Sequence, residues 1–460
     1  MTKDRNLDRD KLDFANGKIG RLFSVLFFPT LIGMIFNSAL TVIDGIFVGR
    51  GVGAEGIAAV NIVAPIFMVS TGIGLMFGIG SSVVASIRLS ESNVKAARII
   101  MTQAFIAGLM MVGLISIVSL LLPYEVVGWL GCSPLLEHHA IDYLLWLVPG
   151  LVFLFIECVG MMLIRLDGSP KYAMTVQIVA AVINIVLDWY MVFPLGMGVK
   201  GAAMATSIAC AAGGVMVLFY FVGMADTLRF YRLKMSVTSL LLTIRNTGYM
   251  MKIGFATFLT EIAMGVMMLT GNYMFMAWLG ENGVAAYAIA CYLFPLVFSM
   301  SNAVAQSAQP IISYNYGARS AERVSRALRV SIVTAVVCGI AVTIGLWLGA
   351  RGITGLFLSP REEAYALAVD GLPLFSICAV FFAANIAFIG YCQSIERAAE
   401  STVYTLLRGV IFLVPCFIML PELAGAEGLW LAIPAAELLT SAVIFTRYAR
   451  GRRRSYIANR

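Results

Sequence analysis

The stretch GAEGIAAV at residues 53–60 returns as GENGVAAY at residues 280–287, displaced by 227 positions. A second stretch, PLGMGVKG at residues 194–201, returns as PELAGAEG at residues 421–428 with the same displacement. A constant displacement between separate anchors indicates a duplicated architecture rather than chance matches. In a strongly hydrophobic chain, this duplication predicts two membrane lobes with a site between or inside them.

The 460 residues are 60% hydrophobic and only 12% charged, with a mean hydropathy of +0.90. Apolar runs of about 20 residues, each long enough to cross a bilayer as a helix, recur along the chain. We therefore expect an all-α integral membrane protein, and we read the first run as a retained helix rather than a cleaved signal peptide. Twelve transmembrane helices are predicted, at about 20–48, 57–82, 97–122, 141–163, 172–194, 202–224, 250–277, 284–310, 327–348, 368–392, 401–420 and 428–447.

Six helices in each half give the two halves the same orientation, so the repeat is parallel and its axis runs along the membrane normal. The predicted N-terminal lobe, with helices 1–6, covers residues 1–225. A basic linker at residues 226–252 leads to the C-terminal lobe, with helices 7–12, at residues 253–460. Two lobes within one chain make a monomer sufficient.

The net charge of +7 is distributed by side of the membrane. Nearly all of the 32 Lys and Arg residues fall at one set of helix ends; the exceptions are Arg50, Lys200, Arg351 and Arg361 on the other side and Arg408 within a helix. Because cationic loops stay in the cytoplasm, both termini are expected there. The positive charge thus indicates topology and contact with anionic lipid headgroups, not nucleic-acid binding.

The motifs of enzymes and cofactor sites are missing from the sequence. The eight cysteines form no CxxC pair, and both histidines, His138 and His139, lie in one predicted external loop without an HExxH pattern. No GKS or GKT phosphate loop occurs. A membrane-embedded enzyme needs a catalytic constellation at membrane depth, so this class is disfavoured, and no cofactor is expected.

Charged residues inside a membrane are costly and mark candidate sites. Asn184 and Asp188 are four apart and share one helix face, while Asp44 and Thr206 reach the same outer half of the membrane in the same lobe. Two carboxylates, an amide oxygen and a hydroxyl form an oxygen-rich cage that suits Na⁺. Held close, the same two carboxylates also favour uptake of a proton.

Three further intramembrane charges are candidate cavity-lining residues. Glu261 and Arg408 lie at equal depth, which allows an ion pair in the second lobe, functional or structural. Glu157 either lines the first-lobe cavity or packs its stem while its head finds a polar partner. These two alternatives stay open.

Several short motifs together resemble the multidrug and toxic compound extrusion (MATE) family, in its prokaryotic branch. They are DGIFVG at residues 44–49, NIVLD at residues 184–188, GAAMAT at residues 201–206 and QPIISYNYGA at residues 309–318, in addition to Pro29 in helix 1. Each motif is weak alone. In this order and over two six-helix halves, the resemblance covers nearly the whole chain.

The resemblance implies a V-shaped, two-lobe antiporter that exports cationic or amphipathic compounds in exchange for Na⁺ or H⁺. It implies a first-lobe cation site at Asp44, Asn184, Asp188 and Thr206, and a helix 1 bend at Pro29. Neutralising the two carboxylates is then expected to weaken drug binding and release the drug outside.

The chain departs from the family pattern at two places. Cys158 stands where the family's helix 4 asparagine ligand is expected, next to Glu157. Glu261 precedes the position of the family's helix 7 glutamate, and helix 10 carries only Asp370, at its outer edge. We therefore expect ion coupling in the first lobe.

The sequence thus predicts a drug/cation antiporter of the bacterial inner membrane. The alternative is a lipid-linked oligosaccharide flippase of a related fold. Such a flippase needs a more cationic cavity for pyrophosphate, and only Arg408 lies deep in a helix.

Overall fold

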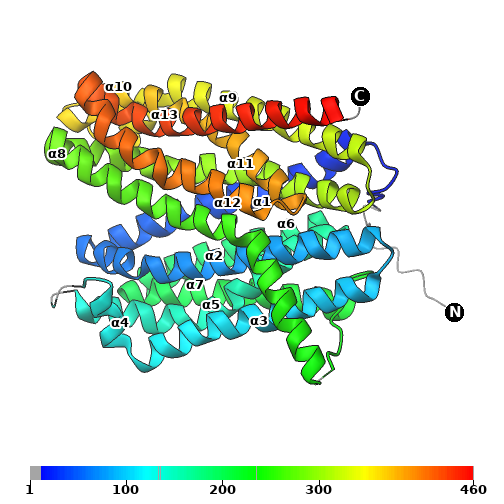
Figure 1. The fold of residues 1–460 in the computed structure, drawn as a ribbon. Helices are drawn as coiled ribbons and strands as arrows, with labels where there is room; N and C mark the ends of the chain where they lie inside the picture. The colour runs from blue at the N-terminus through cyan, green and yellow to red at the C-terminus, as the bar shows by residue number, and fades with distance from the viewer. Residues whose placement is uncertain (1–11, 133, 135, 235, 459–460) are drawn as a thin grey trace. The chain divides into compact units, whose positions relative to one another are not determined.

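The computed structural model describes residues 12–132, 134, 136–234 and 236–458, which form helices and no strand (Figure 1). The helices before the linker are α1 (Ile19–Gly51), α2 (Ala54–Ser90), α3 (Val94–Leu121), α4 (Pro123–Trp129), α5 (Glu137–Leu166), α6 (Pro170–Val192), α7 (Gly198–Phe219) and the π-helix η1 (Tyr220–Met224). Those after it are α8 (Val237–Gly317), α9 (Ala321–Phe357), α10 (Glu363–Ser376), α11 (Cys378–Ser394), α12 (Ala398–Leu406), the π-helix η2 (Leu407–Ile411) and α13 (Leu413–Ala458).

Ten helical stretches of the described residues are long and apolar enough to cross a membrane. Two of them are too long for one crossing: Val237–Gly317 has 81 residues and Ala398–Arg450 has 53, whereas a span needs about 20. Each contains one glycine with a non-helical backbone, Gly280 at φ 63° and Gly425 at φ 62°. Because each break divides a stretch in two, the ten stretches correspond to the twelve predicted helices.

The duplication is visible in the backbone. Gly53 and Gly198, the first-half equivalents of the two break glycines, also have positive φ, 91° and 59°. Ser92 and Arg319, again 227 positions apart, have φ of 60° and 56°. In both cases the N–H of the next residue bonds to the carbonyl five positions back at 2.9 Å, the same helix-ending motif. The two halves therefore repeat their turn geometry as well as their helix order.

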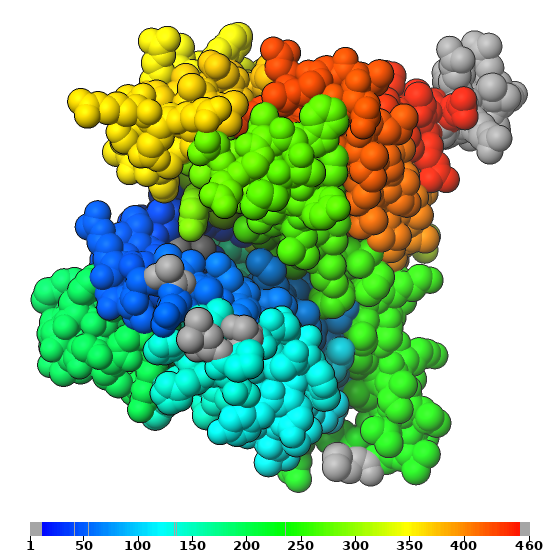
Figure 2. Space-filling model, turned by 90° about the vertical axis from the view of Figure 1, so that its left-hand side faces the viewer, coloured from blue at the N-terminus to red at the C-terminus, as the bar shows by residue number. Residues whose placement is uncertain are grey.

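The chain divides into two compact units. Unit 1 comprises Met1–Glu261, Gln306–Ala327 and Gln393–Glu396; unit 2 comprises Ile262–Ala305, Leu328–Cys392 and Arg397–Arg460. Figure 2 looks onto one end of unit 1, where the α1–α2 turn (blue), the α6–α7 turn (teal) and the α4 region (cyan) lie side by side.

Glycines allow close helix packing in unit 1. A Cβ on Gly254 of α8 would fall on the backbone of Met76 in α2, and one on Gly80 of α2 would fall on the backbone of Met250 in α8. These two helices therefore touch backbone to backbone, which only glycine permits.

Part of the segment 226–252 is fastened to unit 1 by Asp167. This carboxylate accepts hydrogen bonds from the N–H groups of Thr227 at 3.0 Å and Leu228 at 2.8 Å, and from the hydroxyl of Tyr220 at 2.7 Å. Helix α8 already begins at Val237, within the predicted linker, so the extended part of this segment is short.

A buried ion pair organises unit 2. Arg408, in η2, donates from Nη2 to Glu437 Oε1 at 2.7 Å and from Nε to the same oxygen at 3.0 Å. Asn385 donates to the other oxygen of Glu437 at 2.7 Å and accepts from Ser441 at 2.8 Å. The Arg408 guanidinium also lies 4.3 Å from the ring centroid of Phe382. The charges are thus paired and hydrogen-bonded, as burial in an apolar helix bundle requires.

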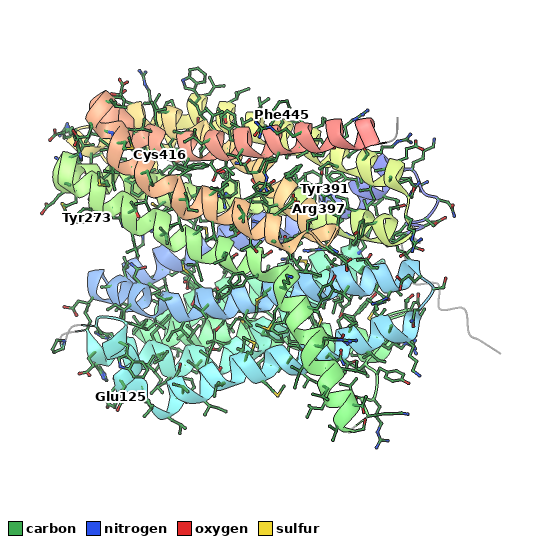
Figure 3. The ribbon with its side chains drawn as sticks, in the orientation of Figure 1. Glu125, Tyr273, Tyr391, Arg397, Cys416 and Phe445 are labelled. Carbon is green, nitrogen blue, oxygen red and sulfur yellow. The ribbon has the colours of Figure 1, made fainter. Side chains whose placement is uncertain are left out.

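Large apolar side chains point away from both units. Figure 3 shows Tyr273 on α8 and Phe445 on α13, which are 75% and 71% exposed. Leu348 on α9 is 83% exposed. Exposed apolar surface of this kind on long apolar helices is what a lipid environment covers.

The backbone contact at Gly254 makes a prediction. Gly254→Ala forces α8 away from α2 and is expected to destabilise the protein by about 1–3 kcal/mol, the usual effect of overpacking. Gly265→Ala, on the same helix with nothing within 4 Å of its new Cβ, is the matched control. Thermal unfolding of the purified protein in detergent measures both; equal unfolding temperatures for the two variants contradict the packing.

The Arg408–Glu437 pair makes a second prediction. Arg408→Met leaves Glu437 as an unpaired buried charge and is expected to cost about 3–5 kcal/mol. The double variant Arg408→Met/Glu437→Leu removes both charges and should recover most of that loss. Chemical or thermal unfolding compares the three proteins, and a double variant less stable than Arg408→Met refutes this interpretation.

Candidate functional site

Three neighbouring helices of unit 1 carry the four predicted cation-site residues. Asp44 lies near the end of α1, Asn184 and Asp188 lie on one face of α6, and Thr206 lies in the third turn of α7. Helix α6 packs against both α1 and α7, and Asp188 is 0% and Asn184 2% exposed. The positive φ of Gly198 closes the short α6–α7 turn and lets α7 return alongside α6.

Asn184 connects Asp188 to Thr206. Since a carboxylate accepts but does not donate, the Asn184 amide turns its Nδ2 toward Asp188 Oδ2, at 3.2 Å. Its oxygen then accepts from both the N–H and the Oγ1 of Thr206, each at 3.2 Å. The amide therefore holds α6 and α7 in register beside the carboxylate.

The carboxyl groups of Asp44 and Asp188 lie close enough to interact with each other. Two carboxyl groups bond to each other only when they share a proton, and without that proton they repel. Asp44 Oδ1 and Asp188 Oδ1 are buried and have no hydrogen-bond partner within the described chain. The acid pair thus presents two orphaned oxygens to an incoming proton or cation.

The chemistry of the four predicted side chains limits what they can bind. Asp44, Asp188, Asn184 and Thr206 supply oxygen only, which hard cations prefer. In the part of the chain that the structure describes, no group of three or more His, Cys, Asp or Glu side chains is placed to hold a metal ion.

Two buried residues of α5 were missed by the sequence reasoning. Tyr143 of α5 is buried and lies close enough to Asp44 and Asp188 for their charges to act on its hydroxyl. Arg165, at the end of α5, was interpreted only as one of the cytoplasmic charges. It is 1% exposed, and its guanidinium donates a hydrogen bond to Gln306 Oε1 at 2.7 Å. The sequence offers no signal for either, because an aromatic or a helix-end cation in a membrane protein is ordinary.

Glu157 and Cys158 point to different helices. The carboxylate of Glu157 lies against Gly213 of α7, where a Cβ would displace it. Cys158 packs on Gly74 of α2, so it fills a helix contact.

The predicted pairing of Glu261 with Arg408 is wrong, because the guanidinium of Arg408 is bound to Glu437 within unit 2. Glu261 is buried on α8 next to Gly72 of α2, in unit 1. Position along the predicted helices could not show whether Arg408 pairs with Glu261 or with Glu437. Pro29 lies inside α1, as expected, and α1 continues through it.

Comparison with known families supports the duplication directly. The sequence profile of the MatE family matches residues 29–190 and matches again at residues 256–418. The two matches together cover more than half of the chain and fall in its two halves.

The chain is similar to proteins named "Multidrug export protein MepA". The relative from Staphylococcus saprophyticus is 25% identical over 413 residues, covering 89% of each chain. The relative from Staphylococcus haemolyticus is 24% identical over 446 residues, covering 96% of each.

Solved structures share the fold at 23% identity. One, described as "Outward-facing conformation of a multidrug resistance MATE family transporter of the MOP superfamily", has a TM-score of 0.88 and covers 95% of this chain and 97% of that chain. Another, "Crystal structure of MATE in the straight conformation", has a TM-score of 0.87 with the same coverage. Two matched halves, twelve membrane-length helices and this fold agree: the chain belongs to the MatE family of multidrug and toxic compound extrusion transporters.

Proposed function

We propose that the protein exports cationic or amphipathic organic compounds in exchange for Na⁺ or H⁺, and that Asp44, Asn184, Asp188 and Thr206 bind the coupling ion. The observation that carries this proposal is the acid pair: two facing carboxyl groups with orphaned oxygens inside an apolar helix bundle. Charged groups at such a depth are retained in transporters where an ion or substrate uses them. The names of the MepA relatives support the export of small molecules.

Ion binding changes the charge of the pair. When both carboxylates are ionised, the site is negative and attracts a cationic drug or the coupling ion. When a proton or Na⁺ enters, the charge falls and the drug is held less tightly. Exchange then follows because the drug and the coupling ion favour different conformations of the protein. Each ligand shifts the equilibrium by the difference between its affinities for the two conformations.

The proposed organisation follows the repeat. The lobes are residues 1–225 and 253–460, joined by the cytoplasmic linker at residues 226–252, with Pro29 as the bend in α1. The protein works as a monomer in the bacterial inner membrane with both termini in the cytoplasm, in contact with anionic lipids. The cation bias of the helix ends supports this orientation.

The ion pair of Arg408 argues against the alternative function, a lipid-linked oligosaccharide flippase. A pyrophosphate carrier needs free positive charge in its cavity. Arg408 is already neutralised by Glu437 and hydrogen-bonded within unit 2, and the buried Arg165 is hydrogen-bonded to Gln306.

The acid pair makes the central prediction. In proteoliposomes loaded with ethidium, Asp44→Asn or Asp188→Asn is expected to reduce gradient-driven transport to the level of empty vesicles, because an amide cannot take up the charge of the coupling ion. The Na⁺ gradient and the pH gradient are imposed separately, so the active gradient identifies the ion.

Glu125→Gln is the control, since this acid lies on the exposed α4 of the same unit (Figure 3). It should transport like the unmodified protein. Wild-type transport by both aspartate variants, shown to be inserted and folded, rules out the proposed site.

A further inference from the structure

On α1 and α6, two helices that pack against each other, two buried oxygens have no hydrogen-bond partner in the described chain. They are Thr30 Oγ1 on α1 and Gln177 Oε1 on α6. Thr30 is only 2% exposed. Within a bilayer no bulk water relieves such atoms, and an unpaired polar group in apolar surroundings is costly. A partner for these two oxygens therefore has to come from outside the described residues.

Gly33 makes room for the glutamine. A Cβ on Gly33 would overlap Gln177 Oε1 and lie 3.1 Å from its Cδ. The glutamine side chain thus lies flat across α1, in a space that only glycine leaves open. Thr30 is one turn before Gly33 on the same face of α1.

The two helices run in the same direction, because Gly33 meets Gln177 and, further along, Gly51 meets Val192. Side chains on a helix lean toward its N-terminus. Gln177 therefore leans toward the level of Thr30. The two orphaned oxygens converge on one short stretch of the α1–α6 contact.

Pro29 supplies a third oxygen at this stretch. Proline has no N–H, so the carbonyl of Val25, four residues earlier in α1, loses its intrahelical donor. A hydroxyl, an amide oxygen and a free carbonyl are neutral oxygen ligands of the kind that bind monovalent cations.

The contact between α1 and α6, here called the seam, continues to the acid pair. Gln177 and Asn184 are seven residues apart, which is two turns on one face of α6, or about 10 Å along the axis. Thr30 precedes Asp44 by fourteen residues on α1. The three oxygens thus lie between the acid pair and the end of unit 1 where α1 and α6 begin.

We propose that Thr30 Oγ1, Gln177 Oε1 and the Val25 carbonyl form a second site, a transit station for a small cation, Na⁺ or hydronium, on its way between the acid pair and that end of unit 1. The proposal rests on the proposed ion coupling. Without a carboxylate the station binds weakly, which suits an ion that must also leave.

Cation binding to the purified full-length protein in detergent tests the station directly. Radioactive sodium measures Na⁺, and proton uptake in weak buffer measures hydronium. We expect a tight site that Asp188→Asn abolishes and a weaker one that Thr30→Val or Gln177→Met abolishes. Thr30→Ser keeps the hydroxyl and should keep the weaker site. Thr175→Val, at an exposed α6 threonine whose hydroxyl bonds to Lys171, is the matched control.

Transport supplies the second readout. Thr30→Val and Gln177→Met should slow gradient-driven ethidium efflux about tenfold, a barrier change of roughly 1.4 kcal/mol, with ethidium affinity unchanged. The proposal is overturned if both variants bind and transport like the wild type, if neither cation shows a second site, or if the variants lose the tight site too. If instead Asp188→Asn transports normally, it is the proposed coupling site that fails.

Discussion

In the hydrocarbon of a bilayer, polar atoms of the chain find partners only within the protein. The architecture follows from this constraint. Long helices satisfy the backbone internally, and the breaks within the two overlong stretches fall at Gly280 and Gly425, where a positive φ carries no steric penalty. In unit 2 the same constraint explains why Arg408 is bound on two nitrogens by Glu437 and why Asn385 covers the other oxygen.

Because most buried polar atoms are paired, the buried oxygens without hydrogen-bond partners mark candidate binding sites. Most buried polar side chains of unit 1 are paired, and four of its side-chain oxygens without partners among the described residues lie on α1 and α6, two helices that pack against each other. Asp44 and Asp188 mark one end of this seam, and Thr30 and Gln177 mark the other. All four atoms are oxygens with free lone pairs, which a cation or a proton donor can fill. In the proposed mechanism, a single helix contact combines the coupling site with the route that leads to it.

The duplication gives each half the same turns but not the same chemistry. The positive-φ residues recur 227 positions apart, so the backbone repeats. The acid pair occurs in unit 1, whereas the corresponding burial of charge in unit 2 is a closed ion pair. The two halves thus share their turn geometry, while the buried charges of unit 2 are paired with each other and the acid pair of unit 1 is not neutralised by a basic side chain in any ion pair of the described residues.

The sequence by itself determined the twelve helices, their repeat and the nearness of Asn184 to Asp188, because apolar length, glycine conformation and helical spacing are local properties. Its ordered motifs also pointed to the family, which the profile match confirmed. Only the tertiary structure decided which side chains are in contact. Arg408 pairs with Glu437 and not with Glu261. Tyr143 lies beside the acid pair, and Gln177 lies across Gly33. These contacts depend on how the packed helices are rotated and shifted relative to one another. The sequence shows how far along its helix a residue lies, but not which residue of a neighbouring helix it faces.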